Sequence, residues 1–128
     1  MKKLRVFRHI FRFHGFNTSV KLAVNGIFYL FLYHRNMRII FLTGIAALLL
    51  GIHFHLKGIE LVALCITITL VFIAEIVNTS IEMMIDMFTR KYHTLIKLLK
   101  DISAAVVLLA CLNAIAVGFI IFAKRIFK

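Results

Sequence analysis

Acidic residues are scarce in this 128-residue chain, which contains five Asp and Glu against sixteen Lys and Arg. Proline is absent, and the only two cysteines, Cys65 and Cys111, both fall within apolar segments. Those positions favour small buried thiols over a disulfide or a metal-binding pair. The chain also lacks a glycine-rich phosphate-binding loop, so any phosphate site would have to be built from side chains and metal.

Hydrophobic residues dominate instead, at 62% of the chain with a mean hydropathy of +1.00. This profile is typical of a helical integral membrane protein, and the length indicates a single membrane domain over residues 1–128. A net charge of +11 would suggest nucleic acid as the partner of a soluble protein. Here the basic residues flank apolar runs, so we expect the membrane and its anionic headgroups as partners, and no nucleic acid.

Apolar periodicity predicts an all-α fold with three transmembrane helices, at residues 37–56, 59–88 and 102–123. Residues 1–14 alternate basic and aromatic residues, and residues 19–34 have an apolar and a polar side, so residues 1–36 are predicted to form amphipathic helices lying in the membrane interface. The middle span would be about 45 Å long, against about 30 Å of hydrocarbon, so its carboxylate-bearing end should emerge into water. We expect a basic loop over residues 89–101 to follow it.

Two sets of small residues recur along the spans and predict close helix packing and self-association of the chain. They are Gly44, Gly51 and Gly58, spaced by seven residues, and Ala110, Ala114 and Gly118 in the third span.

The distribution of lysine and arginine predicts the orientation in the membrane. Eight lie in residues 1–38 and four in residues 89–100, and three spans place these two groups on the same side. Lys57 and the three basic residues after the third span fall on the other side. The larger group favours a cytoplasmic N-terminus in the cell membrane, with the basic tail as a weak argument against it.

Four of the five acids fall within residues 75–101, next to a long apolar run. Glu75, Asn78, Glu82 and Asp86 stand at i, i+3, i+7 and i+11, which is one stripe on a helix face. Placing a charge at the bilayer centre costs about 2.5 kcal/mol or more in free energy. The placement of these acids therefore indicates a functional role and not a role in helix packing alone. Carboxylates with an amide and no soft ligand favour a hard cation such as Mg²⁺, and hence phosphate chemistry.

The stripe is one of several short segments along the chain that together form a recognisable pattern. They are VNGI at 24–27, RNMR at 35–38, AEIVNTSIEMMID at 74–86, Tyr92 with His93, and KDISAAVVLLA at 100–110. Together they resemble the bacterial diacylglycerol kinase family, which includes the undecaprenol kinases. The resemblance covers about residues 19–122.

The resemblance implies a homotrimeric lipid kinase of the bacterial inner membrane, with three spans and a surface helix in each copy. It implies transfer of the γ-phosphate of ATP, with Mg²⁺, to undecaprenol or diacylglycerol at the cytoplasmic interface. Glu75 would be the general base and contact the lipid, and Glu82 would bind Mg²⁺ and the nucleotide. The other implied ATP-binding residues are Asn78, Asp86, Tyr92, His93, Lys100 and Asp101, and the other implied lipid-binding residues are Asn36 and Arg38.

One position departs from the family pattern. His34 stands where members usually carry a glutamate that would bind the metal together with the Glu82 position. Histidine is a poorer Mg²⁺ ligand than a carboxylate. The sequence therefore leaves open an alternative, a catalytically weakened or non-enzymatic helical membrane protein that binds lipid or ions through the Glu75/Glu82 stripe.

Overall fold

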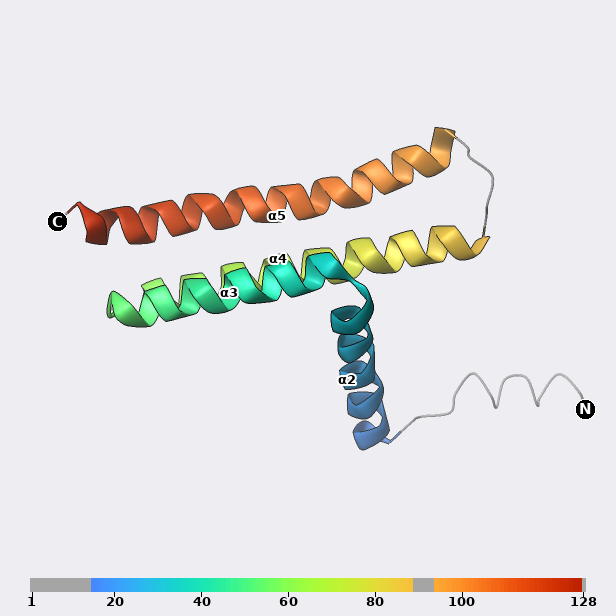
Figure 1. Cartoon of the computed structure of the whole chain (residues 1–128), viewed down its shortest axis with the longest axis horizontal. Coiled ribbons are helices and arrows are strands. Elements are labelled where there is room, and N and C mark those ends of the chain that lie inside the picture. Colours follow the sequence, from blue (N-terminus) through green and yellow to red (C-terminus); the bar gives the residue numbers. More distant parts are fainter. Residues whose placement is uncertain (1–14, 89–93, 128) are drawn as a thin grey trace, which may run out of the picture. The chain divides into compact units, whose positions relative to one another are not determined.

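The computed structural model describes residues 15–88 and 94–127, and these ranges are helical almost throughout. Four helices follow one another along the chain (Figure 1): α2 (Phe16–Tyr33), α3 (Arg35–His53), α4 (Ile59–Phe88) and α5 (Thr94–Ile126). The interfacial helix expected at the start of the chain lies outside the described residues.

The chain forms two compact units, Met1–His34 and Arg35–Lys128. In the first unit, α2 begins after Gly15, whose carbonyl accepts hydrogen bonds from the backbone N–H groups of Thr18 and Ser19. The helix ends at Tyr33, and His34 caps it, with its N–H donating to the carbonyl of Leu30 over 2.9 Å.

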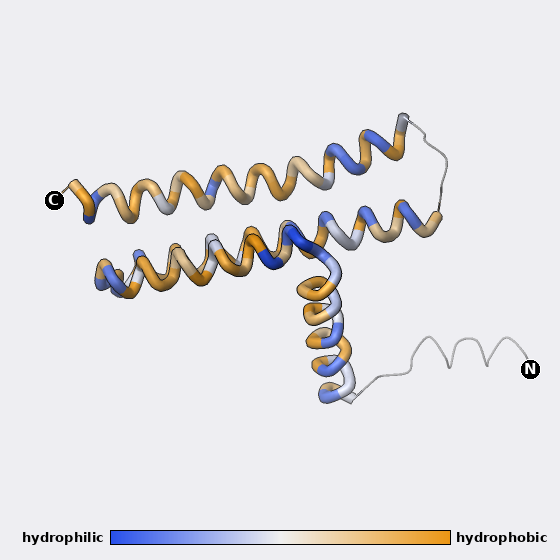
Figure 2. Tube along the Cα trace, in the orientation of Figure 1, coloured by the Kyte–Doolittle hydropathy of each residue, from blue (hydrophilic) through white to orange (hydrophobic). Residues whose placement is uncertain are grey.

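The second unit consists of α3, α4 and α5, each long and apolar enough to cross a membrane. The predicted all-α class with three spanning helices is confirmed. The helices alternate in direction, and α4 packs against both α3 and α5. Figure 2 shows apolar residues along most of their length, with polar residues gathered towards the end of α4 and the start of α5.

The start of α5 contradicts the prediction of a loop over residues 89–101, because the helix already begins at Thr94. No glycine or proline interrupts this segment, and Lys97 and Lys100 can extend their charged ends beyond their apolar stems. Lys100 and Asp101 therefore lie inside the helix and not at its first residue.

Two glycines of α3 allow it to approach α4 closely. A Cβ atom at Gly44 would lie 3.0 Å from Cγ2 of Ile68, and one at Gly51 would lie 3.1 Å from Cδ2 of Leu64. The third glycine of the predicted set, Gly58, is not part of this contact: it lies in the α3–α4 turn with φ +58° and has open space around it.

The C-terminus of α3 is closed by a Schellman motif. The N–H of Leu56 donates to the carbonyl of Gly51 over 2.9 Å, and the N–H of His55 donates to the carbonyl of Ile52 over 3.0 Å. Leu56 is buried beside Leu64, which fixes the turn against α4. His55 adopts φ 54°, the left-handed conformation for which glycine is preferred.

We expect His55→Gly to raise the free energy of unfolding by about 1 kcal/mol, because glycine adopts this conformation without a Cβ penalty. His53→Gly is the matched control, since His53 is the last residue of α3 and glycine should lower helix stability there by up to about 1 kcal/mol. Thermal unfolding of the two variants in detergent measures the difference. If both variants shifted the unfolding midpoint in the same direction, the Schellman motif would be contradicted.

Candidate active site

One end of the site is shielded from water. It contains Glu75 and Asn78, which are 4% and 8% exposed. They lie on the buried face of α4, directly after a run of apolar residues. Among the residues that the structure describes, the carboxylate of Glu75 has no hydrogen-bond or ion-pair partner. An acidic residue that is almost fully buried within a membrane-spanning helix, with no partner among the described residues, favours a functional reason for its presence.

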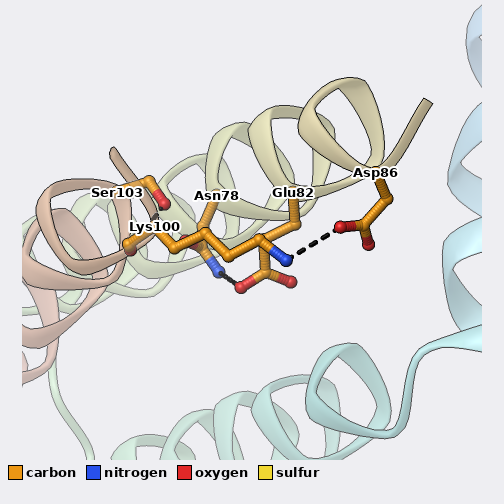
Figure 3. A network of polar contacts seen from close by, with 5 residues as sticks. All are labelled: Asn78, Glu82, Asp86, Lys100 and Ser103. Carbon is orange, nitrogen blue, oxygen red and sulfur yellow. Dashed lines mark hydrogen bonds and ion pairs between the residues drawn. The ribbon is translucent and has the colours of Figure 1, made fainter. Parts of the chain in front are cut away.

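The next turn of α4 links Asn78 to Glu82. The amide nitrogen Nδ2 of Asn78 donates to Oε1 of Glu82 over 3.3 Å (Figure 3). The amide oxygen Oδ1 of Asn78 is buried, and no described residue donates to it. The site therefore offers an unused acceptor beside a half-buried carboxylate.

Helix α5 supplies the cation of the site. Nζ of Lys100 donates to Oδ1 of Asp86 over 2.8 Å, and Glu82 is close enough to interact electrostatically with the same ammonium group. Figure 3 shows the lysine reaching from α5 to the carboxylates of α4. The hydroxyl of Ser103, 3% exposed, donates to the backbone carbonyl of Lys100 over 3.0 Å.

Exposure rises along the stripe. Glu75 and Asn78 are buried, Glu82 is half-buried and Asp86 is exposed. The distance from Glu75 to Asp86 along the helix axis is about 16 Å. The site therefore runs from an environment shielded from water to one open to it.

Of the other predicted site residues, those that the structure describes do not join this network. Tyr92 and His93 lie outside the described residues, and Asp101 is exposed with no interaction among the described residues. Asn36 and Arg38 are exposed in the first turn of α3.

The predicted metal pair of Glu82 and His34 stays a prediction, because His34 belongs to the first unit and Glu82 to the second. Within the described ranges, no three His, Cys, Asp or Glu residues gather into a group that could hold a metal ion. The oxygens of Glu82 and Asn78 are nevertheless hard donors of the kind that Mg²⁺ prefers, with water and phosphate oxygens completing its coordination.

The sequence analysis missed two features of the α4–α5 pair. One is Ser103, a small buried residue one turn after Lys100. The other is an ion pair at the opposite end, where Nη2 of Arg125 lies 2.7 Å from Oε2 of Glu60. The first turn of α4 and the last turn of α5 carry opposite charges, and an antiparallel pair of helices brings such turns together.

The family model for prokaryotic diacylglycerol kinase matches residues 21–122 of this chain. This chain belongs to that family. The matched range includes every predicted site residue, both those in the network and those outside the described residues.

Two known kinases are clearly similar to this chain in sequence. A diacylglycerol kinase of Synechocystis sp. is 39% identical over 102 residues, which cover 79% of this chain and 58% of the relative. An undecaprenol kinase of Bacillus subtilis is 30% identical over 92 residues, which cover 72% of this chain and 75% of the relative. The chain thus spans less than two thirds of the Synechocystis protein.

We expect Asp86→Asn to leave the midpoint of thermal unfolding nearly unchanged, because the side chains of Lys100 and Asp86 are 40% and 67% exposed and solvent weakens their attraction. Glu60→Gln is the matched control, as it removes the ion pair at the other end of the same two helices. Thermal unfolding of both variants gives the comparison. A large loss for Asp86→Asn alone would show that the pair holds the fold together.

Proposed function

We propose that this protein is an ATP-dependent lipid kinase that transfers the γ-phosphate of ATP to the hydroxyl group of a membrane lipid. The observation that carries the proposal is Glu75, an almost fully buried residue whose carboxylate has no partner among the described residues, on the same stripe of α4 as Glu82. Membership of the prokaryotic diacylglycerol kinase family supports it.

Glu75 is suited to act as the general base. It takes the proton of the lipid hydroxyl, whose oxygen then attacks the γ-phosphorus. The bond from that phosphorus to the β–γ bridging oxygen breaks, and ADP leaves with its electrons. The burial of Glu75 keeps water away from this end of the stripe, which protects the phosphate from hydrolysis.

The water-facing half of the stripe is suited to the nucleotide. Phosphoryl transfer requires mainly positioning and neutralisation of phosphate charge, and Lys100 supplies a cation between two carboxylates. Glu82 and Oδ1 of Asn78 would hold Mg²⁺ together with phosphate and water oxygens. When bound, the ion would neutralise the charge of the phosphates. Asp86 positions the lysine, and Tyr92, His93 and Asp101 are proposed to border the nucleotide.

We place the protein in the bacterial inner membrane with its N-terminus and the end of α4 on the cytoplasmic side, where ATP is present. The lipid alcohol is undecaprenol or diacylglycerol, the substrates that the names of the two relatives give for those proteins. Arg38 and Asn36, exposed at the start of α3, are proposed to contact the lipid.

We propose further that the chain works as a homotrimer. Asn113 lies near the middle of α5, is exposed, and has no partner among the described residues. An amide that faces hydrocarbon gains from a hydrogen bond to another helix, which a second copy would supply. Gly118 likewise has open space in a single copy.

A second candidate function is a weakened or non-enzymatic member of the family that binds lipid or ions. One observation favours it: position 34 is a histidine, where the family resemblance implies a metal-binding carboxylate. An assay of the wild-type protein with Mg·ATP and each lipid distinguishes the candidates. Binding of lipid without any phosphorylated product would select this second function.

Glu75→Gln should lower kcat for lipid phosphorylation by about 10²–10⁴-fold while the protein remains folded, because the amide cannot accept the proton. The measurement is transfer of labelled phosphate from ATP to undecaprenol and to diacylglycerol. Glu60→Gln, a change of the same kind at the other end of α4, is the control and should retain activity. Similar rates of lipid phosphorylation by the wild type and Glu75→Gln would show that Glu75 is not the general base.

The mass of the purified protein in mild detergent should correspond to three copies. Asn113→Leu should reduce the trimeric fraction, because it removes the amide that a neighbouring helix would bond. Leu112→Ile, a change at the neighbouring exposed residue, should leave the fraction unchanged. A fully active monomer would rule out sites shared between copies.

A further inference from the structure

The end of the second unit that lies away from the candidate active site carries basic residues for which lipid phosphorylation has no evident use. This end consists of the α3–α4 turn, residues 54–58, and the last turn of α5. Lys57 lies in the turn, and Lys124 and Arg125 lie in the last turn of α5. Figure 2 shows hydrophilic residues at both places, where long apolar helices end.

Two contacts hold the turn, α4 and the end of α5 together. The ring centroids of Phe54 in the turn and Phe122 in α5 lie 5.9 Å apart. Nη2 of Arg125 lies 2.7 Å from Oε2 of Glu60, which belongs to the first turn of α4. The segments that carry the basic residues therefore keep a fixed arrangement, which needs little further ordering when a ligand binds.

Positive charge at this end is not balanced by acidic residues. Glu60 is the only one of the chain's five acids outside residues 75–101, and Arg125 already pairs with it. Lys57 and Lys124 are exposed. Neither forms an ion pair within the described residues, which include all five acids. The two ammonium groups are therefore available to an anion.

Large apolar side chains follow both lysines along the chain. Ile59 begins α4 two residues after Lys57, and Ile126 and Phe127 come directly after the basic pair of α5, and all three are exposed. A fully hydrated anion such as inorganic phosphate gains nothing from such neighbours. An occupant with a negatively charged headgroup and an apolar body matches both the charge and the apolar surface of this end.

We propose that this end of the protein binds the headgroup of an anionic phospholipid. Lys57 and Lys124 donate hydrogen bonds to its phosphate oxygens, and the exposed apolar side chains contact the first carbons of its acyl chains. The bound lipid lies in the leaflet opposite the candidate active site, because the two ion pairs of α4 and α5 mark opposite ends of these spans. The phospholipid is not phosphorylated there, so the inference does not depend on the kinase function.

Lys57→Gln and Lys124→Gln, singly and together, test the proposal. Both lysines are exposed, and the Arg125–Glu60 pair stays intact, so we expect all three variants to fold with a thermal midpoint close to that of the wild type. A double variant with Lys57→Arg and Lys124→Arg keeps both charges and should keep the lipid. Lys97→Gln is the matched control, because Lys97 is exposed near the start of α5, at the other end of the helix.

The measurement uses the full-length protein in mild detergent and requires no turnover. Phosphatidylglycerol with a diazirine on the first carbons of one acyl chain is photocrosslinked at a sub-saturating concentration, and the labelled residues are mapped by mass spectrometry. We expect label within residues 53–60 and 121–127 of the wild type. A basic residue beside an anionic lipid contributes about fivefold in affinity, so each glutamine variant should lower this label about fivefold and the double variant about 25-fold.

Competition with unlabelled molecules identifies what the site recognises. Displacement of the label by phosphatidylglycerol, but not by phosphatidylcholine or water-soluble glycerol phosphate, supports the proposal. Retention of the label in the double arginine variant and in Lys97→Gln supports it further. Equal displacement by phosphatidylcholine overturns it, since charge is then not recognised. Displacement by glycerol phosphate as effective as by phosphatidylglycerol assigns the site to a free phosphate and also overturns it, as does unchanged label in the double glutamine variant.

Discussion

A carboxylate can be kept inside a membrane-spanning helix only where neighbouring helices shield it from hydrocarbon. Glu75 meets this condition because α4 packs against both α3 and α5, which leaves its residue 4% exposed. The close approach of α3 depends on Gly44 and Gly51, whose missing side chains leave room for Ile68 and Leu64. The packing of three apolar helices thus buries a single glutamate within a membrane-spanning segment.

Two ion pairs join α4 to α5 at opposite ends of the spans, Arg125 with Glu60 and Lys100 with Asp86. A slide of one helix along the other would break both pairs, so they favour one register between the helices. That register brings Lys100 to the carboxylates of the stripe. Apolar residues between the pairs line a groove among α3, α4 and α5.

Much of the fold follows from the sequence because helix formation in apolar segments depends on local pattern. The presence of three helices long and apolar enough to span a membrane was predicted correctly, since each is a long run with few charges. The predicted loop was wrong for residues 94–101, because α5 already begins at Thr94. Gly58 was assigned to a packing seam by its spacing, although its conformation places it in the turn.

The sequence by itself determined the helices and the placement of Glu75, Asn78, Glu82 and Asp86 on one helix face, since both depend on a repeat of 3.6 residues within one segment. Only the tertiary structure decided which residues of α5 meet that face. The contact of Lys100 with Asp86, the burial of Ser103 and the groove beside Gly118 all join helices that are separate in sequence. Such contacts are set by how helices pack and not by the periodicity of any one of them.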